Sequence, residues 1–439
     1  MNRCVTLAFV GDVRLGEGMN QDLCWRSCLS FWDGALPILQ QAQAVFANLE
    51  GGIEAPRAIL SEATSEATSE ATSEATVKPQ NLSPSPLEIG AIPPATQLLR
   101  AANIQFVSLA NHHALGCSAQ QLVRTMQSLG AAQIAYAGAG TTASMAALPV
   151  RLNMAFLPTG ILAYAGQEAH SLHQSNLDDR APQSSVKTPI KSQSCINLLE
   201  LPKVGARAGD RTKDCTISSL KQAVEDPLKV TPKNRKISHL NDNKNYIELN
   251  GKTNRSQIKP QVVQKNLAWS TLEHVEQAIK DLRNAGVELI ILSLHWGPSL
   301  EISPSKEFRS LAHRLIDLGV DILHGHGTHI FQAVEVYRHK LILYNTGDIL
   351  SDAPIDPRIR NDWSFIFLVD LDREGIQRLR MVPVHLHYAN IELAKHEVFE
   401  AICHRMQSLC AEFQTAAVRT QEGLVVDVRH NGKYCLNVL

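Results

Sequence analysis

The sequence predicts an α/β fold, in which helices cover a β-sheet. Short apolar runs typical of buried strands alternate with amphipathic patterns typical of helices in both halves of the chain. Polar and charged residues directly follow several of the apolar runs. Because sites in open α/β sheets form at the carboxyl ends of the strands, the same pattern predicts where a functional site would lie.

In the N-terminal half, the expected elements alternate regularly. Strands are expected over Val5–Val10, Ala44–Ala47 and Ile104–Leu109, with weaker candidates over Ile134–Ala137 and Met154–Leu157. Helices are expected over Trp32–Gln43 and Ala95–Ala102, and a third helix is capped by Ser118 and ends at Gly130.

Two segments break this alternation and predict insertions at about 55–90 and 167–264. The first contains Ser-Glu-Ala-Thr repeated four times over residues 61–76, which offers no large apolar side chain to a core. The second is rich in Ser, Lys, Asn, Asp and Pro, and its basic residues outnumber its acids. We expect a mostly disordered, solvated loop there, with a partner-binding arm as the alternative.

The C-terminal half returns to the alternation. Ser270–Glu273 forms a capping box for a helix that ends at Gly286. Further helices are expected over Ser305–Leu318 and Glu397–Phe413. The expected strands are Val287–Leu294, Val320–Leu323, Leu341–Tyr344, Phe365–Leu371 and Leu424–Val428.

The composition is that of an ordinary globular protein. The net charge of −1 and the 5% of aromatic residues do not favour binding to nucleic acid or to an acidic membrane. Nine cysteines without a Cys-x-x-Cys pair indicate reduced thiols rather than a disulfide framework. With no apolar run long enough to cross a bilayer and no export signal, we expect a cytoplasmic protein without a membrane span.

Histidines, carboxylates and one amide follow the expected strands in the sequence. The residues in this position are Asp12, Glu50, Asn111, His112, His113, His295, His324, His326 and His329. Taken singly, each is more often a turn residue or a hydrogen-bonded structural group. Together they form a constellation at one sheet edge, where imidazoles are good ligands for a transition metal.

The mixture of ligand types indicates which ions this edge would hold. Oxygen and nitrogen ligands together suit Mn, Fe or Zn better than Ca or Mg. Two such ions would clamp a phosphoryl oxygen and make hydroxide at neutral pH, and a histidine beside them would protonate the leaving oxygen. Asp348 ends a later strand and is expected either to line the same edge or to be a turn aspartate.

Six motifs occur in a fixed order along the chain. They are Gly11-Asp12, Asn48-Leu49-Glu50, Leu109-Ala-Asn-His-His113, His295-Trp-Gly297, Gly325-His-Gly-Thr-His329 and Tyr344-Asn-Thr-Gly-Asp348. Their order and spacing, from residue 3 to about 390, resemble the CapA family, which is associated with capsule and poly-γ-glutamate synthesis. That family looks like an offshoot of the calcineurin-like metallophosphoesterases, and the resemblance implies a four-layer α/β/β/α sandwich.

The resemblance also implies roles for individual residues. Metal ligands would be Asp12, Glu50, His112, His295, His326 and His329, with Asn48, Asn111 and Asp348 as possible support. His113 would be the catalytic histidine. One or two ions of Mn, Fe or Zn are expected. Arg14 stands where the superfamily has its first histidine, and Gly116 where an aspartate is usual, and these departures leave one metal, or none, as the alternative.

Two functions fit these expectations. The first is a metal-dependent hydrolase of a phosphoester or related bond, acting in capsule or poly-γ-glutamate synthesis on an anionic substrate or polymer. The alternative is a polyanion-binding or assembly factor that keeps the fold without turnover. Residues 1–390 would form the family domain, and residues 391–439 a C-terminal helix and strand extension.

Overall fold

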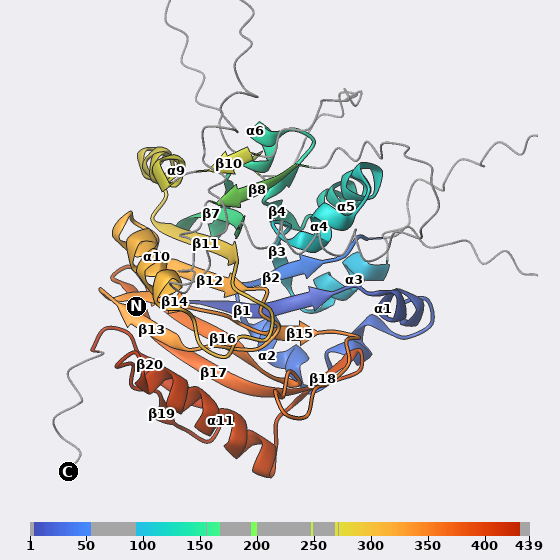
Figure 1. Ribbon diagram of the computed structural model, residues 1–439, viewed down its shortest axis with the longest axis vertical. Coiled ribbons are helices and arrows are strands. Elements are labelled where there is room, and N and C mark those ends of the chain that lie inside the picture. Colours follow the sequence, from blue (N-terminus) through green and yellow to red (C-terminus); the bar gives the residue numbers. More distant parts are fainter. Residues whose placement is uncertain are drawn as a thin grey trace, which may run out of the picture.

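The computed structural model describes residues 4–53, 94–154, 156–166, 195–199, 247–248, 268–270 and 272–430 (Figure 1). The first predicted insertion and most of the second lie outside these residues. Two pieces of the second, β8 (Cys195–Leu199) and β9 (Ile247–Glu248), pair with other strands, so the prediction of a loop is wrong there. Thr271 of the predicted capping box also lies outside the described residues.

The described chain contains two mixed sheets of ten strands each, which confirms the predicted α/β fold. Sheet 1 has the order β19-β20-β17-β16-β1-β2-β3-β4, with β15 on β1 and β18 on β17. Its strands are β1 (Val5–Arg14), β2 (Ala44–Glu50), β3 (Ile104–Ser108), β4 (Ala135–Ala137), β15 (Asp348–Leu350), β16 (Trp363–Asp372), β17 (Gly375–His387), β18 (Asn390–Leu393), β19 (Val418–Arg419) and β20 (Leu424–Asp427).

Sheet 2 has the order β10-β8-β7-β11-β12-β14-β13, with β5, β6 and β9 off this path. Its other strands are β5 (Ala139–Gly140), β6 (Val150–Met154), β7 (Leu157–Gly166), β10 (Ala268–Ser270), β11 (Leu289–His295), β12 (Ile322–His326), β13 (Val334–Tyr337) and β14 (Lys340–Leu343). Strands β7, β11, β12 and β14 are parallel, and such strands are buried on both faces, which explains their continuous apolar runs.

Helices cover the sheets, as Figure 1 shows for α10 beside β12, α3 beside β3, α5 beside β4 and α11 along β17. Their bounds are α1 (Glu17–Asp22), α2 (Leu36–Gln41), α3 (Pro94–Ala101), α4 (His112–Gly116), α5 (Ala119–Ala131), α6 (Ala143–Ala146), α9 (Leu272–Asn284), α10 (Lys306–Asp317) and α11 (His396–Ala411). The predicted cap of α5 is present, since Ser118 Oγ accepts from Gln121 N. Ser305 caps α10 in the same way, because its Oγ accepts from Phe308 N. Among the described helices, none combines the length and apolar character needed to span a membrane.

The two sheets contact each other where β1 passes β12. The His324 Nε2 atom lies 3.0 Å from the carbonyl oxygen of Val10, and the His324 ring meets the Phe9 ring edge-on at 5.3 Å. Behind this contact, Phe9 stacks on Phe46 at 4.9 Å, and Phe46 contacts Phe106. This aromatic core holds β1 and β2 in place and therefore positions the polar residues at their ends.

Several strands extend further at their carboxyl ends than the sequence predicted. Strands β1, β2, β11 and β12 continue beyond their predicted ends, so Asp12, Glu50, His295, His324 and His326 lie inside strands and not on loops. The reason is that these polar residues are buried and remain in the ladders, as in the pairing of Asp12 with Asp348 in β15.

Two other expectations need correction. The strand predicted over Met154–Leu157 is a reversal, because Met154 ends β6, Leu157 begins β7, and the two strands pair antiparallel. The helix predicted over Trp32–Gln43 is a 3₁₀ turn (Asp33–Ala35) followed by α2. Trp32 is fully buried and donates from Nε1 to the carbonyl of Leu98 at 3.0 Å, which holds it outside the helix.

We expect Gly11→Ala to destabilise the protein because β1 approaches the chain before β15 closely. An added Cβ at Gly11 would lie 1.8 Å from the carbonyl oxygen of Gly347. The free energy of unfolding, measured by urea denaturation, should fall by about 2–3 kcal/mol or more, as in severe overpacking. The control is Gly130→Ala in α5, where nothing lies within 4 Å of the added methyl. It should be neutral or stabilising by up to about 1 kcal/mol, and equal effects of the two changes would contradict the close approach.

Candidate functional site

The predicted site residues converge at the carboxyl ends of parallel strands from both sheets. Sheet 1 supplies the end of β1, the end of β2 and the residues after β3, and sheet 2 supplies the ends of β11 and β12. The start of β15 lies beside β1. The residues gathered there are Asp12, Asn48, Glu50, Asn111, His112, His113, His295, His326, His329 and Asp348.

Three carboxylates are buried in this region. Asp12 is 0%, Glu50 1% and Asp348 2% exposed. The register places Asp12 opposite Asp348 on one side and opposite Asn48 on the other. Burial of charged groups costs free energy unless partners compensate it, so the surroundings of these carboxylates decide what the site is.

Two amides orient the carboxylates. Asn48 Nδ2 donates to Asp12 Oδ1 at 2.9 Å and to Glu50 Oε1 at 3.3 Å. Asn111 Nδ2 in turn donates to Asn48 Oδ1 at 3.0 Å, and Asn111 Oδ1 caps α4 by accepting from Ala114 N. The chain of bonds joins the start of α4 to the ends of β1 and β2, which is the position expected of supporting residues.

Glu50, His112 and His295 form what we call the imidazole cluster. His112 Nδ1 lies 3.0 Å from His295 Nε2, and His295 Nδ1 lies 3.8 Å from Glu50 Oε1. One ligand atom from each of the three residues lies within 4.8 Å of the other two. This is close enough for one ion to bind all three after small side-chain rotations.

Asp12, His329 and Asp348 form what we call the carboxylate cluster. His329 Nδ1 lies 2.9 Å from Asp348 Oδ1 and 3.3 Å from Asp12 Oδ2. Their ligand atoms also lie within 4.8 Å of one another. Asn48 joins the two clusters, since its amide donates to a carboxylate of each.

Burial keeps three imidazoles neutral at physiological pH. It lowers the pKa of His112 to about 4, that of His326 to about 3 and that of His295 well below its usual range. Only a neutral imidazole has a lone pair for a metal, so these side chains are in the state that ligation requires.

His329 has the opposite electrostatic setting. Although burial opposes it, the charge of Asp348 and the hydrogen bonds with Asp12 and Asp348 raise the pKa of His329 well above its usual range. These contacts therefore favour the protonated form of this side chain. To act as the predicted ligand, it would have to give up its proton.

The pKa values of Asp12 and Glu50 are shifted in opposite directions. Burial, together with the charge of Glu50, raises the pKa of Asp12. Burial would raise the pKa of Glu50 as well, but the close contact of His113 and the nearby charge of His329 hold that pKa well below its usual range. Glu50 is therefore more firmly ionised than Asp12.

His113 and Arg14 are the partly exposed members of the site. His113 Nε2 lies 3.2 Å from Glu50 Oε2, with its side chain 35% exposed. Arg14 Nε lies 3.4 Å from Glu50 Oε2, and Arg14 Nη1 lies 3.9 Å from Asp348 Oδ2. Both side chains stand between the buried carboxylates and solvent, where an anionic ligand would arrive.

Two histidines stand apart from the clusters. His326 Nε2 lies 2.8 Å from Ser293 Oγ, and its Nδ1 lies 3.9 Å from Asp12 Oδ1, so it borders the carboxylate cluster without joining it. His324 is fully buried and uses Nε2 to bond the Val10 carbonyl. His324 is thus part of the contact between the sheets.

Arg14 and Ser293 contact site residues although neither was predicted to do so from the sequence. Arg14 was considered only as a replacement for a histidine, yet it lies two residues beyond Asp12 in the same strand. Alternate residues of a strand point to the same face, and so do Ser293 and His295 in β11. This period of two was the available signal for both residues.

Gly327 explains the glycine within the Gly-His-Gly-Thr-His motif. Its φ is +101°, and a Cβ there would lie 2.5 Å from Cε1 of His295. The backbone N–H of Gly327 itself donates to Asp12 Oδ2 at 3.2 Å. The glycine thus lets the backbone pass between a predicted ligand and a buried carboxylate.

Several buried polar atoms of the site lack hydrogen bonds within the part of the chain that the structure describes. They are Glu50 Oε2, His113 Nε2, His295 Nδ1 and His326 Nδ1. Buried polar atoms are normally satisfied, and groups left without a bond point to an ion, a water or a ligand. The donor set and these free atoms together fit a divalent transition metal.

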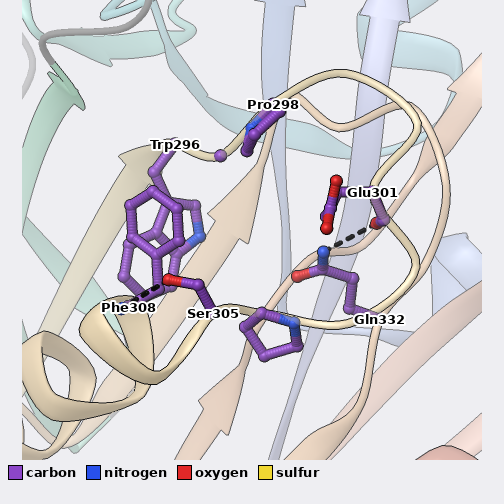
Figure 2. A pocket seen from close by; sticks show the side chains of 8 residues that line it. Trp296, Pro298, Glu301, Ser305, Phe308 and Gln332 are labelled. Carbon is purple, nitrogen blue, oxygen red and sulfur yellow. Dashed lines mark hydrogen bonds between the residues drawn. The ribbon is translucent and has the colours of Figure 1, made fainter. Parts of the chain in front are cut away.

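A pocket of about 100 Å³ lies beside the site but does not contain it (Figure 2). It is lined by Trp296, Gly297, Pro298, Glu301, Pro304, Ser305, Phe308 and Gln332. Trp296 directly follows His295, and successive side chains at a strand end point to opposite faces. The pocket therefore belongs to the α10 side of sheet 2, where the Trp296 ring meets Phe308 edge-on at 5.1 Å.

Comparison with known proteins gives one family. The family model described as "Bacterial capsule synthesis protein PGA_cap" matches residues 6–353. A probable polyglutamine synthesis accessory protein of Mycobacterium tuberculosis is 27% identical over 143 residues, which is 31% of this chain and 38% of that protein. The PGA biosynthesis protein CapA of Bacillus subtilis is 29% identical over 102 residues, 23% of this chain and 26% of that protein.

A further relative is the capsule biosynthesis protein CapA of Bacillus anthracis. It is 32% identical over 81 residues, which is 18% of this chain and 20% of that protein. The aligned regions thus span less than two fifths of the length of each of these three relatives.

We expect Arg14→Gln to destabilise the protein. Within the described residues, the ion pairs of Asp12, Glu50 and Asp348 are made only with Arg14 and with histidines. Loss of the guanidinium leaves buried charge uncompensated, and because Arg14 is partly exposed we discount the cost to about 1–3 kcal/mol in urea unfolding.

The control for this change is Arg358→Gln. Arg358 pairs with Asp356 at 3.2 Å, but its side chain is 87% exposed. That change should have no measurable effect on stability. If Arg14→Gln is equally silent, Arg14 does not compensate the buried carboxylates.

Proposed function

We propose, since the chain belongs to the bacterial capsule synthesis protein PGA_cap family, that it acts in capsule or poly-γ-glutamate synthesis as a metal-dependent hydrolase of a phosphoester or related bond. The observation that carries the proposal is the pair of His/carboxylate clusters at adjoining strand ends, with buried ligand atoms that lack hydrogen bonds in the described structure. The substrate would be an anionic small molecule or polymer.

The residues suited to hold the ion are those of the two clusters. Glu50, His112 and His295 offer one set, and Asp12 and Asp348 offer another that His329 joins on losing its proton. A bound Mn, Fe or Zn ion supplies positive charge that polarises a phosphoryl oxygen and promotes ionisation of water. Asn48 and Asn111 keep the carboxylates oriented toward this position.

His113 is suited to move the proton. Its ring is partly exposed, and its Nε2 lies 3.2 Å from Glu50 Oε2. A protonated imidazole at the solvent side of the clusters would donate to the leaving oxygen as general acid. Arg14, beside it, has a planar set of donors that matches a phosphate or carboxylate group.

Three predictions, on the order of the layers, the domain bounds and the cellular location, belong to the same proposal. The two sheets with helices beside them are compatible with a four-layer α/β/β/α order. A family domain over residues 1–390 with an extension over 391–439 is proposed as before, although β20 of that extension pairs with β17. A cytoplasmic location also stays a prediction.

The second candidate function is polyanion binding without turnover. It is favoured by Arg14, whose guanidinium contacts Glu50 of one cluster and Asp348 of the other where the superfamily has a ligand histidine. Arg14 and His113 would then hold the carboxylates of a polyglutamate chain. This alternative keeps the geometry of the site but assigns no proton transfer to His113.

Metal analysis and turnover of an aryl phosphate test the hydrolase. We expect the purified protein to carry one or two equivalents of Mn, Fe or Zn and to cleave the ester. His295→Ala should lose the metal of the imidazole cluster and the activity, because it removes a central member of that cluster. His113→Ala should keep its metal and lose activity by about 10²–10⁴-fold, the usual contribution of a general acid.

The matched control is His404→Ala, since His404 is exposed on α11 away from both clusters, and it should change neither readout. A clean preparation without stoichiometric metal would refute the hydrolase. Metal without turnover, together with salt-sensitive polyglutamate binding that survives His113→Ala, would instead support the binding factor.

A further inference from the structure

The hairpin of β17 and β18 brings two histidines and a glutamate to one face of sheet 1, outside both clusters. His385 and His387 are two residues apart in β17, so their side chains point to the same side. The antiparallel register places Glu392 of β18 directly opposite His385. The His385 and His387 ring centroids lie 4.5 Å apart.

The distances between the potential ligand atoms match those around a tetrahedral ion. His387 Nε2 lies 3.0 Å from Glu392 Oε1, and His385 Nδ1 lies 3.7 Å from the same oxygen. Bonds of 2.0–2.1 Å to a tetrahedral Zn²⁺ would place ligand atoms about 3.3 Å apart. The observed separations lie on either side of this value, and all three ligand atoms fall within 4.8 Å of one another.

A second layer of contacts fixes the orientation of His385. Its Nε2 lies 2.9 Å from Asp362 Oδ2, so a proton on Nε2 leaves the lone pair of Nδ1 facing Glu392. Asp362 is itself held by Arg360, whose Nε and Nη2 donate to its two oxygens at 2.8 and 2.7 Å. A carboxylate behind a histidine is the arrangement that orients and strengthens histidine ligands of metals.

We propose that His385, His387 and Glu392 form a second metal site, for Zn²⁺ or a similar divalent transition ion. Two imidazoles and one carboxylate provide three protein ligands and leave a fourth position for water or another group. The site is open to solvent, because the side chains of His387 and Glu392 are 46% and 40% exposed. An ion here would tie β18 to β17 across the end of the hairpin.

The hairpin also contacts the segment that carries Asp348. Ala389 N, in the turn between β17 and β18, donates to the carbonyl of Ser351 at 3.0 Å. Asp352, the next residue, accepts from Met19 N at 3.1 Å. An ion at the hairpin would therefore stabilise a turn that is packed against the end of β15.

The test is zinc titration of the full-length chain in a His295→Ala/Asp348→Asn background, which removes one ligand from each of the two clusters. Competition with a chromophoric chelator should show one equivalent of Zn²⁺ bound at micromolar concentration or tighter. His387→Gln and Glu392→Gln should each weaken binding by more than about 100-fold, and Asp362→Asn by about 10–100-fold, the usual effect of losing an orienting partner. Zn²⁺ should also raise the urea midpoint of the background protein but not of its His387→Gln derivative.

The control is His430→Gln. His430 and Asp427 form an exposed pair at 3.0 Å with similar exposure, but they belong to no group of three ligands within the described residues. That change should leave the one equivalent of bound Zn²⁺ and its affinity unchanged. Unchanged zinc affinity in both His387→Gln and Glu392→Gln, or no binding below millimolar concentration, would overturn the hairpin site and leave the catalytic proposal untouched.

Discussion

The buried carboxylates of Asp12, Glu50 and Asp348 set the central constraint on this molecule. Three acids at the meeting point of two sheets repel one another, and their charge must be compensated or neutralised by protonation. The chain supplies Arg14 from the solvent side, and His329, whose protonated form these carboxylates favour. The neutral imidazoles nearby offer lone pairs and no charge, which leaves room for a further cation.

The fold produces this arrangement from the ends of strands that are distant in sequence. Parallel pairing of β1 with β2 and β15 puts side chains from residues 12, 48 and 348 in one row. The contact of His324 with Val10 brings the ends of sheet 2 to the same place. Glycines at 11 and 327 permit the close approaches, and the amides of Asn48 and Asn111 hold the carboxylates in position.

Much of this could be predicted, because apolar runs and motif order are local properties. The order of six motifs predicted the CapA relationship, which the match over residues 6–353 confirms, and it indicated which residues would meet. Strand ends such as that of β1 were placed too early because burial of a polar residue is decided by distant partners. The His385–Glu392 pairing was likewise invisible, since only the hairpin register creates it.

The most direct test is a crystal structure with anomalous diffraction measured at the absorption edges of Mn, Fe and Zn. We expect an anomalous peak within bonding distance of Glu50, His112 and His295, with or without a second one at Asp12 and Asp348. His329 should then contact the ion or move away from it. Metal-replete crystals without a peak at either cluster, in which Arg14 and a protonated His329 alone neutralise the carboxylates, would contradict it.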